Sequence, residues 1–138
     1  MPSTDLLPAI AAVCFVTFLA VSALGAPRRA VGWRFPAALA TVFLAFTVAT
    51  IAAAGWLGFW HEHVRGWWSN QIWFDLLLAI GTAWSLLLPQ ARRLGMRPAA
   101  WLVLICLSGC IGLLAMYARV RYLQQHADLA DHAALART

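Results

Sequence analysis

The sequence predicts an all-α polytopic membrane protein, with four transmembrane helices in an antiparallel bundle and a short C-terminal helical tail. Hydrophobic residues make up 63% of the chain and charged residues only 11%, and the mean hydropathy is +0.76. Soluble domains, in contrast, carry about a quarter charged residues. The charges lie in clusters between long neutral stretches. A stretch of about 20 apolar residues crosses a hydrocarbon core about 30 Å thick as a helix, so each stretch predicts a membrane span.

The first two helices follow from the first two neutral stretches. One is predicted over residues 6–24 and ends before Gly25 and Pro27, which are typical stop signals. It has neither a basic segment before it nor a cleavage pattern after it, so we expect it to be retained rather than removed as a signal peptide. The next is predicted over residues 35–60. Pro36 lies in its first turn, where a missing N–H costs no hydrogen bond.

The second half of the chain predicts two more helices, over residues 70–88 and 99–122, separated by a basic turn at 89–98. Residues 1–123 would therefore form the transmembrane domain. The polar segment 124–138 is expected to continue as a water-exposed or interfacial helix.

The arginines predict an orientation. With four spans, the loops 25–34 and 89–98 share one side of the membrane and hold six arginines and no acid. The other side holds four arginines with every carboxylate and histidine. Because basic residues in short loops mark the cytoplasmic side, we expect these loops to be cytoplasmic and both termini to lie outside. The net charge of +5 then reflects topology rather than nucleic-acid binding, since no folded polar surface carries the arginines.

The stretch GFWHEHVRGWWSNQIWFDLLLA, residues 58–79, raises the question of a metal site. Its tryptophans favour the boundary between water and lipid. His61 and His63 flank Glu62, a pattern that binds metal when the backbone is extended, but in a helix the two rings point in nearly opposite directions. No third ligand has a fixed spacing to them. We therefore expect solvated histidines and no metal, and no haem or other cofactor, because the predicted spans contain no histidine.

Asp75 is an ionisable residue inside the third predicted helix, which makes it a functional-site hypothesis. In a structural interpretation it pairs with Arg119 in the last turn of the fourth helix, and each charge is favoured by its own helix dipole. In a functional interpretation Asp75, with Glu62 as a second candidate, is the acid in a pocket lined by Trp73 and Trp84. The structural interpretation is favoured, because charged side chains in a membrane are usually tolerated through pairing. The polar side chains that could complete a pocket there are Asn70, Gln71 and Tyr117.

Residues 70–123 resemble a small bacterial integral-membrane family catalogued as domain of unknown function 2834. The resemblance is carried by an Asn, an aromatic-rich approach to an Asp that opens a helix, a basic ARRLG turn, and a closing Tyr-x-Arg end. The matching positions are Asn70, Phe74, Asp75, Ala91, Arg92, Arg93, Leu94, Gly95, Tyr117 and Arg119. The resemblance implies four helices with Asp and Arg at their ends, in a bacterial inner membrane. It implies no reaction.

Two classes of function follow from these features. No base, nucleophile and oxyanion donor lie at a spacing that defines a reaction, which favours a non-catalytic accessory or scaffold subunit. Its expected partners are the lipid bilayer and either a larger membrane complex or further copies of the chain. The alternative is a membrane enzyme that acts on an isoprenoid or another lipid-soluble substrate, since tryptophan faces stabilise cationic intermediates. A transporter ranks third, because none of the four short helices is expected to be broken.

Overall fold

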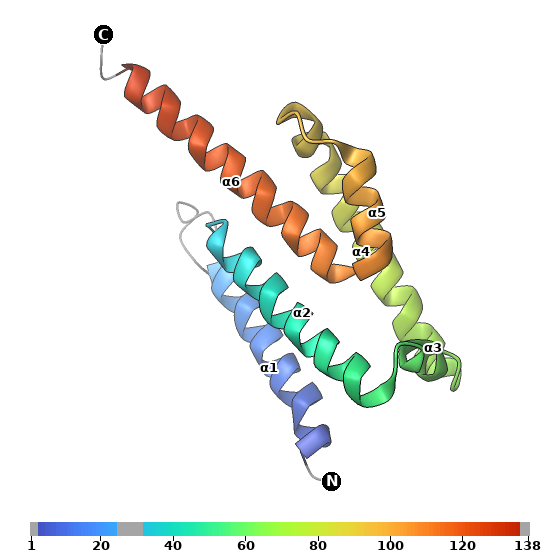
Figure 1. Ribbon diagram of the computed structural model, residues 1–138. Coiled ribbons are helices and arrows are strands. Elements are labelled where there is room, and N and C mark those ends of the chain that lie inside the picture. The colour runs from blue at the N-terminus through green and yellow to red at the C-terminus, as the bar shows by residue number, and fades with distance from the viewer. Residues whose placement is uncertain (1–2, 25–31, 136–138) are drawn as a thin grey trace. The chain divides into compact units, whose positions relative to one another are not determined.

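In the computed structural model, every regular element of the described part of the chain is a helix, which confirms the all-α class. The chain divides into two units. The first contains α1 (Ser3–Leu24), and the second begins at Gly32 and contains the other five helices (Figure 1). These are α2 (Arg34–Ala54), α3 (Gly58–His63), α4 (Trp67–Arg93), α5 (Pro98–Ser108) and α6 (Cys110–Leu135). The described residues are 3–24 and 32–135, with side chains described outside 3–5, 21–22 and 130–134.

The helix predicted over residues 35–60 is shorter than expected. It ends at Ala54, because Gly55 adopts a left-handed φ of 79° that residues other than glycine rarely reach. The Gly55 N–H donates to the carbonyl of Ile51 at 2.8 Å, which closes the last turn. Residues 58–63 then form α3 as a separate short helix.

α4 is longer than the predicted 70–88, because it runs through Pro89 to Arg93. The proline removes one backbone hydrogen bond, but the turn after it is held by packing, since Ala91 is fully buried. The helix ends at Arg93, and Gly95 two residues later turns the chain with a φ of 69°. The Met96 N–H donates to the carbonyl of Ala91 and the Gly95 N–H to that of Arg92, which is a Schellman cap.

The prediction of one continuous helix over residues 99–122 is wrong, because two helices occupy this range. α5 ends at Gly109, whose φ of 57° and ψ of −124° turn the chain back, and α6 begins at the next residue. Gly112 lets the two helices approach closely. A Cβ at this position would lie 3.0 Å from the Ile105 backbone and 2.8 Å from the Ser108 hydroxyl. α5 and α6 therefore form a hairpin with its apex at Gly109 (Figure 1).

The hairpin returns α6 to the end of the unit where α2 begins and α4 ends. The rings of Trp33 and Tyr122 meet edge to face, with centroids 5.5 Å apart. The Gln124 side chain donates to Gln90 Oε1 at 3.2 Å. Packed between these ends, α6 contacts α2, α4 and α5.

The core lies in only one half of this unit. Its main cluster belongs to the C-terminal half of α4, to α5 and to α6, where Met116 and Val120 are fully buried. Pro36 and Ala40 near the start of α2 are buried as well. The apex of the hairpin lies beside Ile80, the central residue of α4, since a Cβ on Gly109 would be 3.8 Å from Ile80 Cδ1. The core residues are Leu87, Ala91, Ile105, Met116 and Val120.

Two helices, α2 and α4, are long and apolar enough to cross a membrane. Their apolar surfaces are almost entirely exposed, whereas the core helix of a soluble protein would be mostly buried. α5 is apolar but has only 11 residues. α6 continues to Leu135, so most of the polar segment 124–138 is helical.

Candidate functional site

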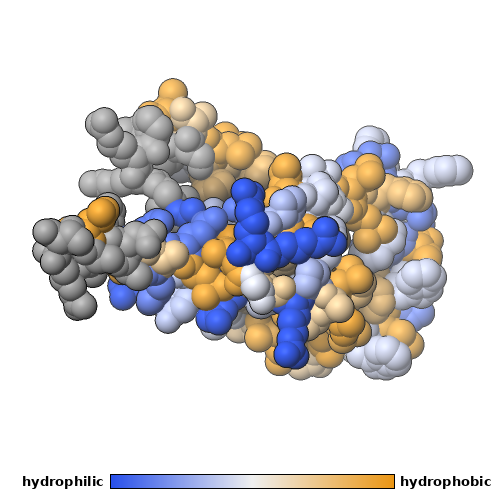
Figure 2. Space-filling model, turned by 90° about the horizontal axis from the view of Figure 1, so that it is seen from above, coloured by the Kyte–Doolittle hydropathy of each residue, from blue (hydrophilic) through white to orange (hydrophobic). Residues whose placement is uncertain are grey.

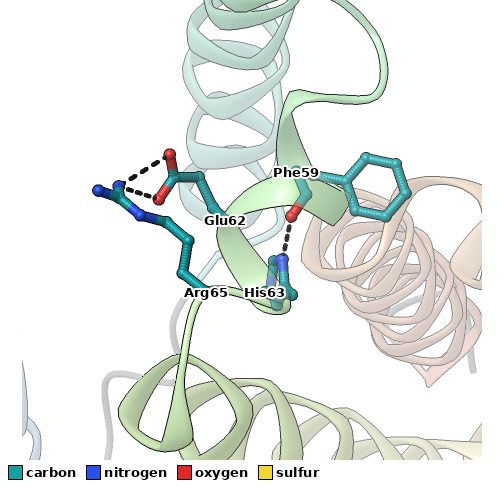
Figure 3. A network of polar contacts seen from close by, with 4 residues as sticks. All are labelled: Phe59, Glu62, His63 and Arg65. Atoms are coloured by element: carbon teal, nitrogen blue, oxygen red, sulfur yellow. Dashed lines mark hydrogen bonds and ion pairs between the residues drawn. The ribbon is translucent and has the colours of Figure 1, made fainter.

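The polar residues around α3 form one local network, drawn in Figure 3. Arg65 Nη1 donates to both Glu62 carboxylate oxygens, at 2.8 and 3.2 Å. This hydrogen bond, and the negative charge behind it, raise the pKa of the Arg65 guanidinium. His63 Nδ1 hydrogen-bonds to the carbonyl of Phe59, one turn earlier. Glu62 is therefore engaged with its neighbour in the chain and is not aimed into a pocket.

His61 and His63 do not converge on a common point. Both lie in a helix, where positions two apart project about 200° apart. The His63 ring packs edge-on against Trp73, with centroids 4.3 Å apart. Within residues 3–24 and 32–135, no group of three or more metal-ligating side chains comes together where side chains are described.

The predicted ion pair between Asp75 and Arg119 is not formed. Asp75 is exposed and accepts hydrogen bonds from Gln71 Nε2, at 3.3 and 3.4 Å. The Arg119 guanidinium lies over the Tyr122 ring, 5.4 Å from its centroid. The prediction failed because it assumed one helix over 99–122. The turn at Gly109 instead sends Arg119 towards the end of α4 opposite to Asp75.

The predicted polar pocket around Asp75 is not assembled either. Asn70 Nδ2 donates to the Gly66 carbonyl at the start of α4. Trp73 contacts His63, whereas Trp84 and Tyr117 pack against the core in the other half. The aromatic residues that were to line one site are thus divided between two regions.

Sequence reasoning missed a regular pattern on α4. Four polar residues between positions 71 and 88 follow the spacing of one helix face, and all four are exposed. At about 100° per residue they fall within an arc of about 80°. We call this set the polar stripe: Gln71, Asp75, Thr82 and Ser85. Its members are separated by four, seven and three residues, and this helical spacing could have identified the polar stripe from the sequence.

A second polar region is the arginine-rich end, formed where α2 begins, α4 ends and α6 passes. Its arginines are Arg34, Arg92, Arg93, Arg97, Arg119 and Arg121. Arg121 Nη1 donates to Gln124 Oε1 at 2.9 Å, and Gln124 in turn donates to Gln90. Hydrophilic side chains gather on this face, as Figure 2 shows from above. Six of the seven arginines with described side chains therefore lie at this end.

Comparison with known proteins adds no family to these observations. No protein-family model, curated protein or solved structure matches the chain.

Proposed function

We propose that the chain is an integral protein of a bacterial inner membrane and serves as a non-catalytic accessory or scaffold subunit of a larger assembly. The exposed apolar surface of α2 and α4 carries this proposal. Monomeric soluble proteins rarely expose contiguous apolar patches of more than a few hundred Å². In a bilayer the same surface is covered by acyl chains.

The topology we propose has three spans, α1, α2 and α4, and a re-entrant hairpin made of α5 and α6. It replaces the four continuous spans expected from the sequence. α5 is about 16 Å long at 1.5 Å per residue, about half the thickness of a hydrocarbon core. The position of Gly109 beside the centre of α4 supports an apex near the middle of the bilayer. Irregular backbone at that depth is tolerated where protein covers it.

The distribution of arginines supports this topology. If the hairpin returns the chain to the side from which α5 starts, every arginine with a described side chain except Arg65 lies at the arginine-rich end. Basic residues of short segments mark the cytoplasmic side. The C-terminal part of α6 is then cytoplasmic, not external as first predicted.

The scattered polar groups favour a scaffold over an enzyme. Glu62 is engaged with Arg65, and Asp75 with Gln71. Trp73 and Trp84, the proposed walls of a substrate pocket, belong to different halves of the unit. General acid catalysis needs the acid within reach of the reacting group in a shaped pocket, and the residues proposed for it are dispersed.

Membrane extraction and native-state sizing test this proposal. The chain should stay in the membrane pellet after washing with alkaline carbonate. In mild detergent it should migrate as an assembly containing a second protein in a fixed ratio. Release of the chain by carbonate would overturn the membrane assignment. A monomer that co-purifies with a bound isoprenoid, and with no protein, would overturn the scaffold role.

A further inference from the structure

The polar stripe lies on the side of α4 that faces away from the core, where a helix surrounded by lipid would carry apolar residues. Ile80, Trp84, Leu87 and Ala91 lie on the face of α4 that packs into the core. The polar stripe lies about 170° away from the centre of that face, at about 100° per residue. A membrane helix normally turns its polar groups towards protein and its apolar groups towards lipid. The outward face of α4 is therefore shaped for contact with protein.

Asp75 gives this face a charge that nothing in the described chain balances. Among the residues with described side chains the one ion pair joins Arg65 to Glu62, and Asp75 contacts only the neutral Gln71. The first helix offers no cation, because the sequence has no basic residue before Arg28. A second copy of the chain would bring another Asp75 to the same depth. A partner that neutralises this carboxylate must therefore be a different protein.

The surface next to the stripe allows a close approach. Gly81 and Ser85 are small residues one turn apart, and a Cβ on Gly81 would meet no atom within 4 Å. Small residues at this spacing let two membrane helices come near each other. Leu78 lies between Asp75 and Thr82 on the same face and is 68% exposed.

We propose that the polar stripe is the docking surface for a transmembrane helix of a different subunit that carries an arginine or lysine at the depth of Asp75. This inference rests on the proposed scaffold function and names the surface and the chemistry of its partner. The basic residue of the partner would pair with Asp75, and Gln71 would complete the hydrogen bonds of the carboxylate. Thr82 and Ser85 would line the contact towards the arginine-rich end.

Site-specific photo-crosslinking in the native membrane tests this surface. A photoreactive residue at Leu78 should give an adduct with a second protein, and the same residue at Leu77, on another face of α4, should give none. The crosslinked peptide should come from an apolar segment with an arginine or lysine. Asp75→Asn should reduce the adduct by about tenfold, a change of about 1.4 kcal/mol in coupling, and Asp75→Glu should retain it.

A charge exchange completes the test. Asp75→Arg should abolish the adduct, and replacement of the partner's basic residue by Asp should restore it. Adducts with lipid alone, with this chain alone, or with a helix that lacks a basic residue would overturn the inference. An unchanged adduct in Asp75→Asn would overturn it too. Carbonate extraction of the same cells separates the two proposals, because a chain that stays in the membrane without a Leu78 adduct refutes only the docking surface.

Discussion

The two halves of the second unit differ sharply in packing. In the packed half, α6 packs against α2, α4 and α5, and its buried side chains meet those of α5 and of the C-terminal half of α4. In the open half, which comprises residues 41–54 of α2, α3 and residues 67–79 of α4, no side chain is buried. Both halves are built from the same long helices. What differs is the presence of α6, which begins near the middle of α4 and runs away from the open half.

This difference indicates where the chain is complete by itself and where it depends on its surroundings. The packed half has buried aliphatic side chains, a Schellman cap on α4 and a glutamine pair between helices. The open half has apolar surface and two exposed carboxylates, Glu62, which pairs with Arg65, and Asp75, which has no basic partner among the described side chains. Stability should therefore reside in the packed half and association in the open half.

The largest effect on stability should come from truncation in the packed half. Met116 is fully buried in the core cluster with residues of α4 and α5, so Met116→Ala should leave a cavity and lower the free energy of unfolding in detergent by about 2–4 kcal/mol. Leu78 is 68% exposed in the open half of α4, and Leu78→Ala should change this free energy by less than about 0.5 kcal/mol. Chemical denaturation followed by tryptophan fluorescence measures both. Equal losses would show that the two halves do not differ in the proposed way.

A smaller effect should come from the glycine inside the hairpin. Gly112→Ala places a Cβ 3.0 Å from the Ile105 backbone, so α5 and α6 must move apart. This should lower the free energy of unfolding by about 1–3 kcal/mol. Gly81→Ala, on open surface of the same kind of helix, should instead gain up to about 1 kcal/mol from helix propensity. Thermal unfolding in detergent compares the two variants. A gain at both positions would mean that α5 and α6 do not pack closely.

The smallest effect should come from the ion pair of the open half. Arg65 and Glu62 are both exposed, so Glu62→Gln should leave the Tm of the detergent-solubilised protein unchanged within error. The raised pKa of Arg65 adds stability that is complete below the ordinary guanidinium pKa and is lost only as the pH rises above the raised value. The arginine should therefore contribute no pH dependence near neutrality. A clear fall in Tm would mean that α3 is better packed than its exposure indicates.

The sequence was sufficient for the class of the fold and for the places of most helices. Neutral stretches bounded by charges identify helices through composition alone, which is a local property. The break at Gly109 is not local, because a glycine within an apolar segment is also compatible with a continuous membrane helix. Whether the helix breaks depends on how α6 packs against α2, and the stretch LSGCIGLL contains no sign of that contact.

The prediction of the candidate site was wrong for the same reason, because it depended on contacts between helices. The pair of Asp75 with Arg119 was deduced from the ends of two antiparallel helices, and it was lost when the second helix proved to be a hairpin. The polar stripe, in contrast, depends only on the spacing of Gln71, Asp75, Thr82 and Ser85 within one helix. Features within an element could be predicted from this sequence, and features between elements required the structure.

The hairpin is the central claim, and cysteine accessibility tests it most directly. In a variant with Cys14, Cys106 and Cys110 replaced by alanine, single cysteines are introduced at His61, Arg97 and Leu129, all of which are exposed. Intact spheroplasts are treated with a membrane-impermeant maleimide, and permeabilised membranes serve as the control. We expect position 61 to be labelled, and positions 97 and 129 to be labelled only after permeabilisation. Labelling of position 129 with protection of position 97 would show that α6 crosses the membrane, and would contradict the hairpin.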